Sequence, residues 1–183
     1  MFKINSNVPC RFIEFNYKEG DKEGRPWRRL QACFVTKDEE WLNHAFFEPM
    51  KDSAFKTVDQ LKQTTFNKVS HICKTLGIEE KEISTYKDFK EWAELIIEKT
   101  KDKRRTDVYI KTIPGYKEGE VELSPWFPFI SLEPNLDYSE KDLEKIKSKG
   151  VTIDDVGDAL DEEADDITEE SLFGEEGDLG LPF

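Results

Sequence analysis

A mainly β fold with a helical insertion, followed by an acidic tail, is predicted by three features of the sequence. The first 48 residues and residues 106–131 have strand composition, with apolar and polar positions that alternate. Residues 57–99, between them, instead have apolar positions spaced as in helices. All 27 Lys and Arg residues precede residue 151, whereas 13 Asp and Glu residues follow it.

The N-terminal part is predicted to contain three strands, at 10–17, 27–36 and 41–48. In the second strand Leu30 and Phe34 fall on one face, and Trp27 and Arg29 fall on the other. The first two strands should pair as an antiparallel hairpin. A long, charged loop over 18–26 is expected to join them, because two glycines and a proline favour turns there.

Amphipathic helices are predicted after the third strand, at 57–76 and 86–99. In the second helix apolar residues recur at i, i+3, i+4, i+7 and i+8, which places them on one face. Gly77 is a natural stop for the first helix because glycine adopts the conformation that often ends a helix. A further short helix is predicted over 136–150.

Strand composition returns at 106–113 and 121–131. In the first of these Ile110 points one way, whereas Tyr109 and Lys111 point the other way. The second contains two prolines, which place it at a sheet edge or a bulge. Three strands, a helical insertion and two strands are the element order of the OB-fold, a five-stranded Greek-key barrel. An α+β sandwich is the competing architecture.

The charge of −13 is confined to the tail. Residues 1–150 hold 27 bases and, since 13 of the 40 acids lie further on, 27 acids, so this part is neutral. Residues 1–37 hold eight bases and four acids and are locally positive. We therefore expect three parts: a barrel domain over 1–135, a short helix or linker over 136–150, and a disordered tail over 151–183.

Several classes of protein are disfavoured by the sequence. Three cysteines provide no disulfide framework and are typical of a reducing cytoplasm, and neither a signal peptide nor a membrane span is predicted. Zinc is not expected, because there is no C-x2-C pair and because His71 and Cys73 on one helix point about 200° apart. Two histidines, no Gly-rich phosphate loop and no nucleophile motif predict no enzyme and no cofactor.

The end of the tail differs from the acidic run before it. A segment that served solubility alone would have no use for the apolar residues of GDLGLPF, where Pro182 restricts the residue before it and Phe183 offers a ring. An apolar pocket with a basic rim would accept such a tip, and the acids upstream would steer its approach. The expected docking residues are Asp178, Leu179, Leu181, Pro182 and Phe183.

This acidic tail with a Pro-Phe ending, behind a body with OB-fold element order, resembles bacterial and phage single-stranded DNA-binding proteins. The resemblance implies a protein that coats and protects single-stranded DNA in the cytoplasm of a bacterial host, during replication, recombination and repair. It also implies that the tip recruits replication and recombination proteins. The tip departs from the bacterial pattern, since Asp-Leu-Gly-Leu stands where consecutive acids are usual. The long helical insertion is closer to the phage proteins.

A groove for single-stranded DNA requires cations along the phosphates and aromatic rings for the bases. Several aromatic residues of this chain lie beside bases in the sequence, on strand faces that are expected to be exposed. The predicted DNA-binding residues are Arg11, Trp27, Arg28, Arg29, Trp41, Arg104, Arg105, Tyr109, Lys111 and Tyr116.

Two other functions stay open at this point. The chain would act as an acidic interaction protein or DNA mimic if it occupied a nucleic-acid-binding partner, although such a mimic should spread its acids over the folded body. An enzyme of another type is the least favoured alternative. The polyanionic tail is also expected to compete with DNA for the basic groove, and homo-oligomers remain open.

Overall fold

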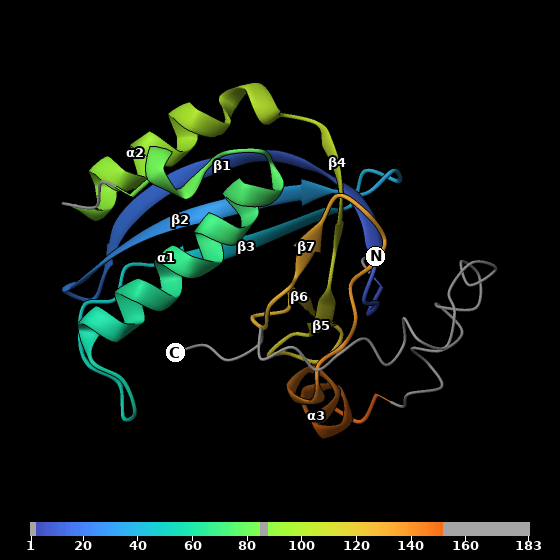
Figure 1. Ribbon diagram of the computed structural model, residues 1–183. Coiled ribbons are helices and arrows are strands. Elements are labelled where there is room, and N and C mark those ends of the chain that lie inside the picture. The colour runs from blue at the N-terminus through green and yellow to red at the C-terminus, as the bar shows by residue number, and fades with distance from the viewer. Residues whose placement is uncertain (1–2, 85–87, 152–183) are drawn as a thin grey trace. The chain divides into compact units, whose positions relative to one another are not determined.

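The computed structural model describes residues 3–84 and 88–151 (Figure 1). They form a mainly β structure with a five-stranded antiparallel sheet and three α-helices, which confirms the predicted class. The predicted tail, beyond Val151, and its docking tip lie outside the described residues.

The sheet has the strand order β3-β2-β1-β4-β7, and β5 pairs with β6 in a separate two-stranded sheet. Four of its strands, read as β4-β1-β2-β3, have the order of a Greek key. No pairing among the described residues closes the sheet into a barrel. The strands are β1 (Val8–Lys22), β2 (Arg25–Val35), β3 (Trp41–Phe47), β4 (Thr106–Ile110), β5 (Thr112–Pro114), β6 (Val121–Leu123) and β7 (Ile130–Ser131).

The β1–β2 hairpin has a tight turn, so the predicted long loop over 18–26 is wrong. Lys22 pairs directly with Arg25, and the two residues between them form the turn. Glu23 and Gly24 have φ angles of 56° and 77°, as in the type I′ turn that matches the twist of paired strands. Residues 18–22 and 25–26 therefore belong to strands, and their side chains alternate between two faces.

Two helices separate β3 from β4, as predicted. Helix α1 (Val58–Thr75) begins at a capping box formed by Thr57 and Gln60, and Gly77 follows its end with a φ of 84°. Helix α2 (Phe89–Thr100) begins at Asp88, whose carboxylate accepts hydrogen bonds from two backbone N–H groups of the first turn. Short 3-10 turns at Glu80–Glu82 and Lys101–Lys103 flank α2.

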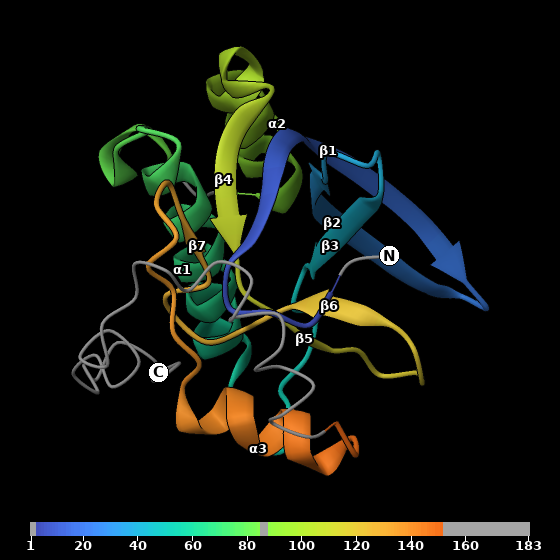
Figure 2. The same ribbon diagram turned by 90° about the vertical axis from the view of Figure 1, so that its right-hand side faces the viewer.

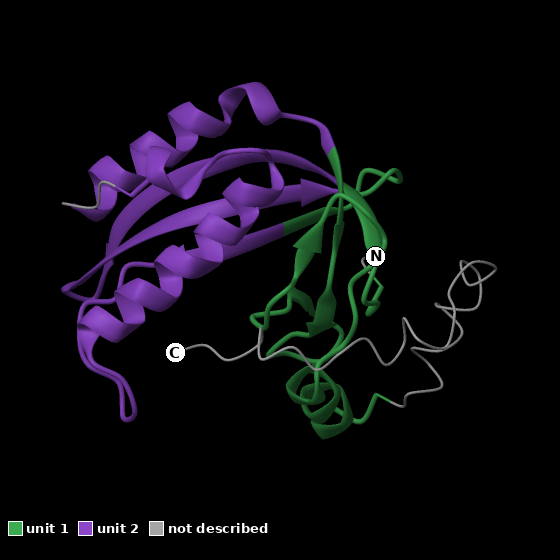
Figure 3. Ribbon diagram, in the orientation of Figure 1, with its two compact units in different colours: residues 1–10, 36–42, 107–182 green, residues 11–35, 43–106, 183 purple. Residues whose placement is uncertain are grey.

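The described chain divides into two compact units, shown in Figure 3. One unit comprises residues 11–35, 43–84 and 88–106. Figure 2 shows α1 and α2 of this unit on one side of its strands, and α2 packs on β2. Its core is aromatic: Phe12 lies 6.0 Å from Phe34 between ring centroids, and Phe89 lies 5.9 Å from Trp92.

The other unit comprises residues 3–10, 36–42 and 107–151. It contains the β5–β6 sheet and α3 (Glu140–Ser148), which packs on β5. Its core includes Ile113 and Ile146, both fully buried, with Trp126 packed against them. The predicted strand over 121–131 is thus two short strands with an irregular segment between them.

None of the helices in residues 3–84 and 88–151 combines the length and the apolar composition needed to cross a bilayer.

Candidate nucleic-acid interface

The two faces of the β1–β2 hairpin carry different residues. Directly paired residues of antiparallel strands point to the same face, and neighbouring pairs alternate. One face holds Phe12 opposite Phe34, Phe15 opposite Ala32 and Tyr17 opposite Leu30. The tilted ring contact between Tyr17 and Phe89 of α2 shows that this is the face covered by helices. The opposite face, here called the open face, carries the polar and charged partners.

Basic residues gather on the open face because the strands alternate. Lys18 and Lys22 alternate in sequence with Glu19 and Asp21, so the two acids fall on the helix-covered face. A β-bulge at Ile13 keeps the alternation in step with the hairpin pairs. The open face thus holds five bases and one acid, a formal charge of +4 from Arg11, Lys18, Lys22, Arg25, Arg29 and Glu14.

An aromatic and cationic cluster lies on the open face where β2 and β3 meet. The guanidinium carbon of Arg29 lies 5.4 Å from the Trp27 ring centroid and 6.0 Å from that of Phe47. The two rings meet edge to face, with centroids 6.4 Å apart. Phe47 is 53% exposed, and Trp27 and Arg29 are half-buried. Such an arrangement offers a ring face and a positive charge within one nucleotide's reach.

Gly20 determines how close the indole lies to β1. It pairs with Trp27 across the hairpin, and a Cβ on residue 20 would lie 2.7 Å from Cζ2 and 2.9 Å from Cε2 of that indole. These distances are shorter than any normal carbon contact. The indole therefore lies directly against the glycine, so its position depends on the absence of a side chain at residue 20.

Three bases of the open face have no neighbouring acid among the described residues. Lys18, Lys22 and Arg25 are exposed, and the described part of the chain places no carboxylate within 4.0 Å of their charged groups. The Nε atom of Arg29 is buried and has no hydrogen-bond partner among the described residues. Cys33 lies on the same face and is buried. Its burial is the main cause, and the negative charge of Glu14 the next, that raises the pKa of its thiol. At Lys18, Lys22 and Arg25 the open face therefore presents positive charge without a neighbouring carboxylate.

Arg28, which the sequence analysis assigned to phosphate, has carboxylate partners within the protein. Its side chain lies on the helix-covered face, 3.1 Å from Asp88, 3.8 Å from Glu48 and 4.0 Å from Glu19. Glu48 first, and then Asp88, raise the pKa of this guanidinium. Its neighbours in the sequence gave no sign of this, because Asp88 lies 60 residues away.

Lys111 is fully buried, so the prediction that it faces solvent is wrong. Its ammonium lies 2.8 Å from the Asp142 carboxylate and donates to the carbonyl of Asp137 at 3.1 Å. Asp142 also accepts hydrogen bonds from the hydroxyls of Ser124 and Ser139. Strand alternation ends at Ile110, and Lys111 occupies the junction between β4 and β5, where its position no longer follows the period of two. Lys111 therefore cannot reach a ligand on the surface and does not belong to the candidate interface.

The remaining predicted residues lie in different places. Arg11 is on the open face, and Arg104 and Arg105 are exposed just before β4 in the same unit. The φ angle of Arg105 is 67°, and its N–H donates to the carbonyl of Phe12 at 2.7 Å. The other unit contains the half-buried Tyr109 and two exposed rings, Trp41 at 57% and Tyr116 at 83%.

Tyr116 and Lys149 form a second, smaller contact between an aromatic ring and a cation. The Lys149 ammonium lies 5.5 Å from the Tyr116 ring centroid and donates to the Tyr116 carbonyl at 2.9 Å. Of the ten predicted residues, the structure thus brings Trp27 and Arg29 into one cluster and places Arg11 on the same face.

The sequence analysis did not assign Phe47 or Gly20 to the interface. It also left out three bases near the hairpin turn: Lys18, Lys22 and Arg25. Phe47 follows the buried Phe46 in β3, so strict alternation along that strand indicates its exposure. The pairing of Gly20 with Trp27 follows once the turn is placed at Glu23 and Gly24. The alternation of the strands therefore indicates these residues, but only when the hairpin turn is placed at Glu23 and Gly24.

Metal ligation finds no support in the described residues, which contain no cluster of three His, Cys, Asp or Glu side chains placed for an ion. Cys10, Cys33 and Cys73 are buried free thiols.

No protein-family model, curated protein or solved structure matches the chain. The interpretation of the open face therefore depends on its own geometry and charge.

Proposed function

We propose that this protein binds single-stranded DNA on the open face of the β1–β2 hairpin, without choice of sequence. The observation that carries the proposal is the separation of charge across the hairpin. Five bases and the Trp27–Arg29–Phe47 cluster share one face, whereas Glu19 and Asp21 lie on the other. Phosphates would follow the bases, and one or more bases of the strand would stack on the exposed rings.

Single strands fit this face better than a duplex does. Stacking on Trp27 or Phe47 requires a base whose flat face is available, and in a duplex that face is covered by neighbouring base pairs. The open face is a sheet surface, and Figure 2 shows the two described helices of its unit on the other side of the strands, so neither projects from this face toward a groove. Shape and chemistry together favour flexible, unpaired nucleic acid.

The strand order supports an OB-type architecture for this sheet. A Greek key of β1 to β4 with the last strand beside β4 is consistent with the five-stranded Greek-key barrel of that fold. OB-folds bind oligonucleotides on a strand face, and the open face is formed by the first three strands. We therefore propose an OB-type domain with a large helical insertion.

The tail completes the proposed function. We infer that Asp178, Leu179, Leu181, Pro182 and Phe183 dock on replication, recombination and repair proteins in a bacterial host cell, as in the family that the sequence resembles. Replacement of Phe183 by Ala should then abolish partner recruitment and leave DNA binding intact, because the tip and the open face are separate in the sequence.

The test of DNA binding is a titration of labelled oligo-dT, followed by fluorescence anisotropy at several salt concentrations. Five phosphate contacts at a slope of about −0.7 each predict that log K falls against log salt with a slope of about −3.5. A Trp27→Ala variant should bind about 5- to 140-fold more weakly, as expected for one lost stack of about 1–3 kcal/mol. A flat salt response, or equal binding by the variant, would contradict the proposal.

A further inference from the structure

Phe55 is the most exposed large apolar side chain of the described residues, at 95% exposure. It lies in the loop between β3 and α1, in the same unit as the open face. A buried phenylalanine stabilises a fold by removing apolar surface from water, and this ring removes almost none. Its presence at this position therefore has no explanation in the packing of the described residues.

The loop that carries Phe55 is held in one conformation by hydrogen bonds. The Ser53 N–H donates to the Lys56 carbonyl at 2.8 Å, and the Ser53 hydroxyl accepts from the N–H groups of Lys56 and Phe55 at 3.0 and 3.4 Å. The carboxylate of Asp52 accepts from the Val58 N–H at 2.7 Å. A ring presented on a fixed backbone loses little conformational freedom when it binds, which favours affinity.

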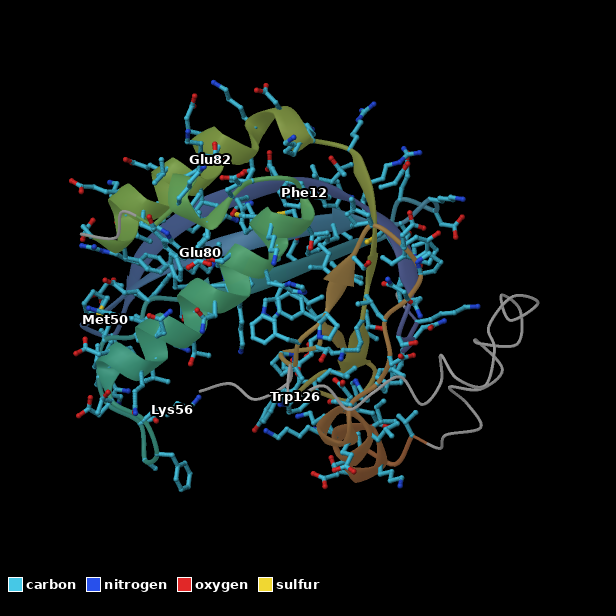
Figure 4. The ribbon with its side chains drawn as sticks, in the orientation of Figure 1. Phe12, Met50, Lys56, Glu80, Glu82 and Trp126 are labelled. Atoms are coloured by element: carbon cyan, nitrogen blue, oxygen red, sulfur yellow. The ribbon has the colours of Figure 1, made fainter. Side chains whose placement is uncertain are left out.

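Two lysines, Lys56 and Lys68, belong to this loop and to the helix that follows it. Figure 4 shows Lys56 and Met50 beside the N-terminal end of α1. Lys68 of α1 is close enough that Lys56, after burial, lowers the pKa of its ammonium. Neither lysine has a carboxylate within 4.0 Å among the residues that the structure describes. Two ammonium groups that repel each other, with no carboxylate within 4.0 Å among the described residues, favour an anionic partner.

We propose that Phe55 is a second stacking residue for single-stranded nucleic acid, with Lys56 and Lys68 as the adjoining phosphate contacts. This inference rests on the proposed function and extends its binding track. The cluster of Trp27, Arg29 and Phe47 lies at the β3 side of the open face, and β3 is an edge strand of the sheet. Phe47 ends β3, and the loop to Phe55 follows it in the chain. A strand that leaves the open face at Phe47 would continue over the edge of β3 to this loop.

The ring and charge together identify the occupant. A protein partner with an apolar pocket would use the ring alone and would gain nothing from two uncompensated ammonium groups. A nucleotide combines a flat face for the ring with a phosphate for the lysines. A second copy of this chain carries a charge of −13 and is the other possible occupant, which the experiment separates.

The test compares wild-type protein with Phe55→Ala, Phe55→Leu and Phe55→Tyr on dT oligomers of roughly 6 and roughly 16 nucleotides, both within the usual range of site sizes. Leu keeps apolar bulk without a ring, and Tyr keeps the ring. We expect Ala and Leu to weaken binding of the long oligomer by about 5- to 140-fold, whereas Tyr stays close to wild type. The short oligomer, which the open face alone can hold, should bind equally to all four proteins.

Three results would overturn the inference, and each has a distinct meaning. Equal binding of the long oligomer by wild type and Phe55→Ala, with Trp27→Ala still impaired, would remove Phe55 and leave the proposed function intact. Wild-type affinity of Phe55→Leu for the long oligomer would show that residue 55 makes a simple apolar contact and does not stack on a base. Self-association of wild type that Phe55→Ala abolishes, measured by sedimentation velocity without DNA, would assign the ring to a second copy. If wild type binds neither oligomer, the proposed function itself fails.

Discussion

Gly20 offers a sharp test of the proposed interface because it would affect DNA binding through one contact, with Trp27. In Gly20→Ala the new Cβ would lie 2.7 Å from Cζ2 of Trp27, so the indole must leave its position on β1. The φ angle of Gly20 lies outside the left-handed region, so alanine fits the backbone without strain. Alanine within a strand is even favoured over glycine by roughly 0.5–1 kcal/mol, so the fold should persist.

The size of the effect follows from the stacking that is lost. A displaced indole no longer offers its ring beside Arg29, whose guanidinium carbon lies 5.4 Å from the ring centroid. Loss of one base stack costs about 1–3 kcal/mol, so the dissociation constant for oligo-dT should rise about 5- to 140-fold. Anisotropy titrations measure this constant, and urea unfolding checks that the variant is as stable as wild type.

A double-mutant cycle separates the indole from other causes. The same Gly20→Ala change in a Trp27→Ala background should have almost no effect on DNA affinity, because the clashing partner is absent. An equal loss of affinity in both backgrounds would refute the reasoning, since residue 20 would then act without Trp27. Unchanged affinity in Gly20→Ala alone would refute it as well.

Three further predictions concern stability and the tail. Lys111→Met should lower the free energy of unfolding by about 3–5 kcal/mol in urea, because Asp142 stays buried without its counter-ion, and adding Asp142→Asn should restore more than half. Burial, and then the charge of Lys68, lowers the pKa of His44 from 6.5 to about 4. Its neutral form is favoured in the folded state, so stability should fall by up to about 3 kcal/mol as the pH drops from 6.5 to 4, and His44→Gln should flatten this part of the profile. Deletion of 152–183 should tighten oligo-dT binding at low salt if the tail competes for the open face, and unchanged affinity would argue against competition.

The helices were predictable because their signals are local. Thr57 and Gln60 form a capping box, and Asp88 caps α2, within four residues of the apolar pattern that each helix presents. Gly77 likewise ends α1 by its own conformation. Such information lies within a few residues of sequence, so no knowledge of the tertiary structure was required.

The hairpin was predicted as a pair of strands, but its charged end was assigned to a loop. Glycines at 20 and 24 and a run of charges resemble a solvated loop, yet Gly20 accommodates Trp27 and only Gly24 turns the chain. Once the turn is placed at Glu23 and Gly24, the same charges separate by face. The error therefore hid the strongest feature of the interface.

The roles of Arg28 and Lys111 depended on residues distant in the sequence. Asp88 binds Arg28 from the start of α2, and Asp142 binds Lys111 from α3, 31 positions away in the sequence. A side chain's charge predicts that it seeks a counter-ion, but the sequence does not reveal whether a phosphate or an internal carboxylate provides it. Arg29 and Arg28 are adjacent, and alternation alone assigns them to opposite faces.

The central claim is that the separation of charge across the hairpin creates the DNA-binding surface, and the salt dependence of oligo-dT binding tests it most directly. One variant neutralises three bases of the open face: Lys18→Gln, Lys22→Gln and Arg25→Gln. A control variant removes the same charge from exposed lysines elsewhere: Lys37→Gln, Lys74→Gln and Lys147→Gln. The first should reduce the steepness of log K against log salt by about 2, which is three contacts at about 0.7 each, and the second should leave the slope close to wild type. Equal slopes in the two variants would contradict the account.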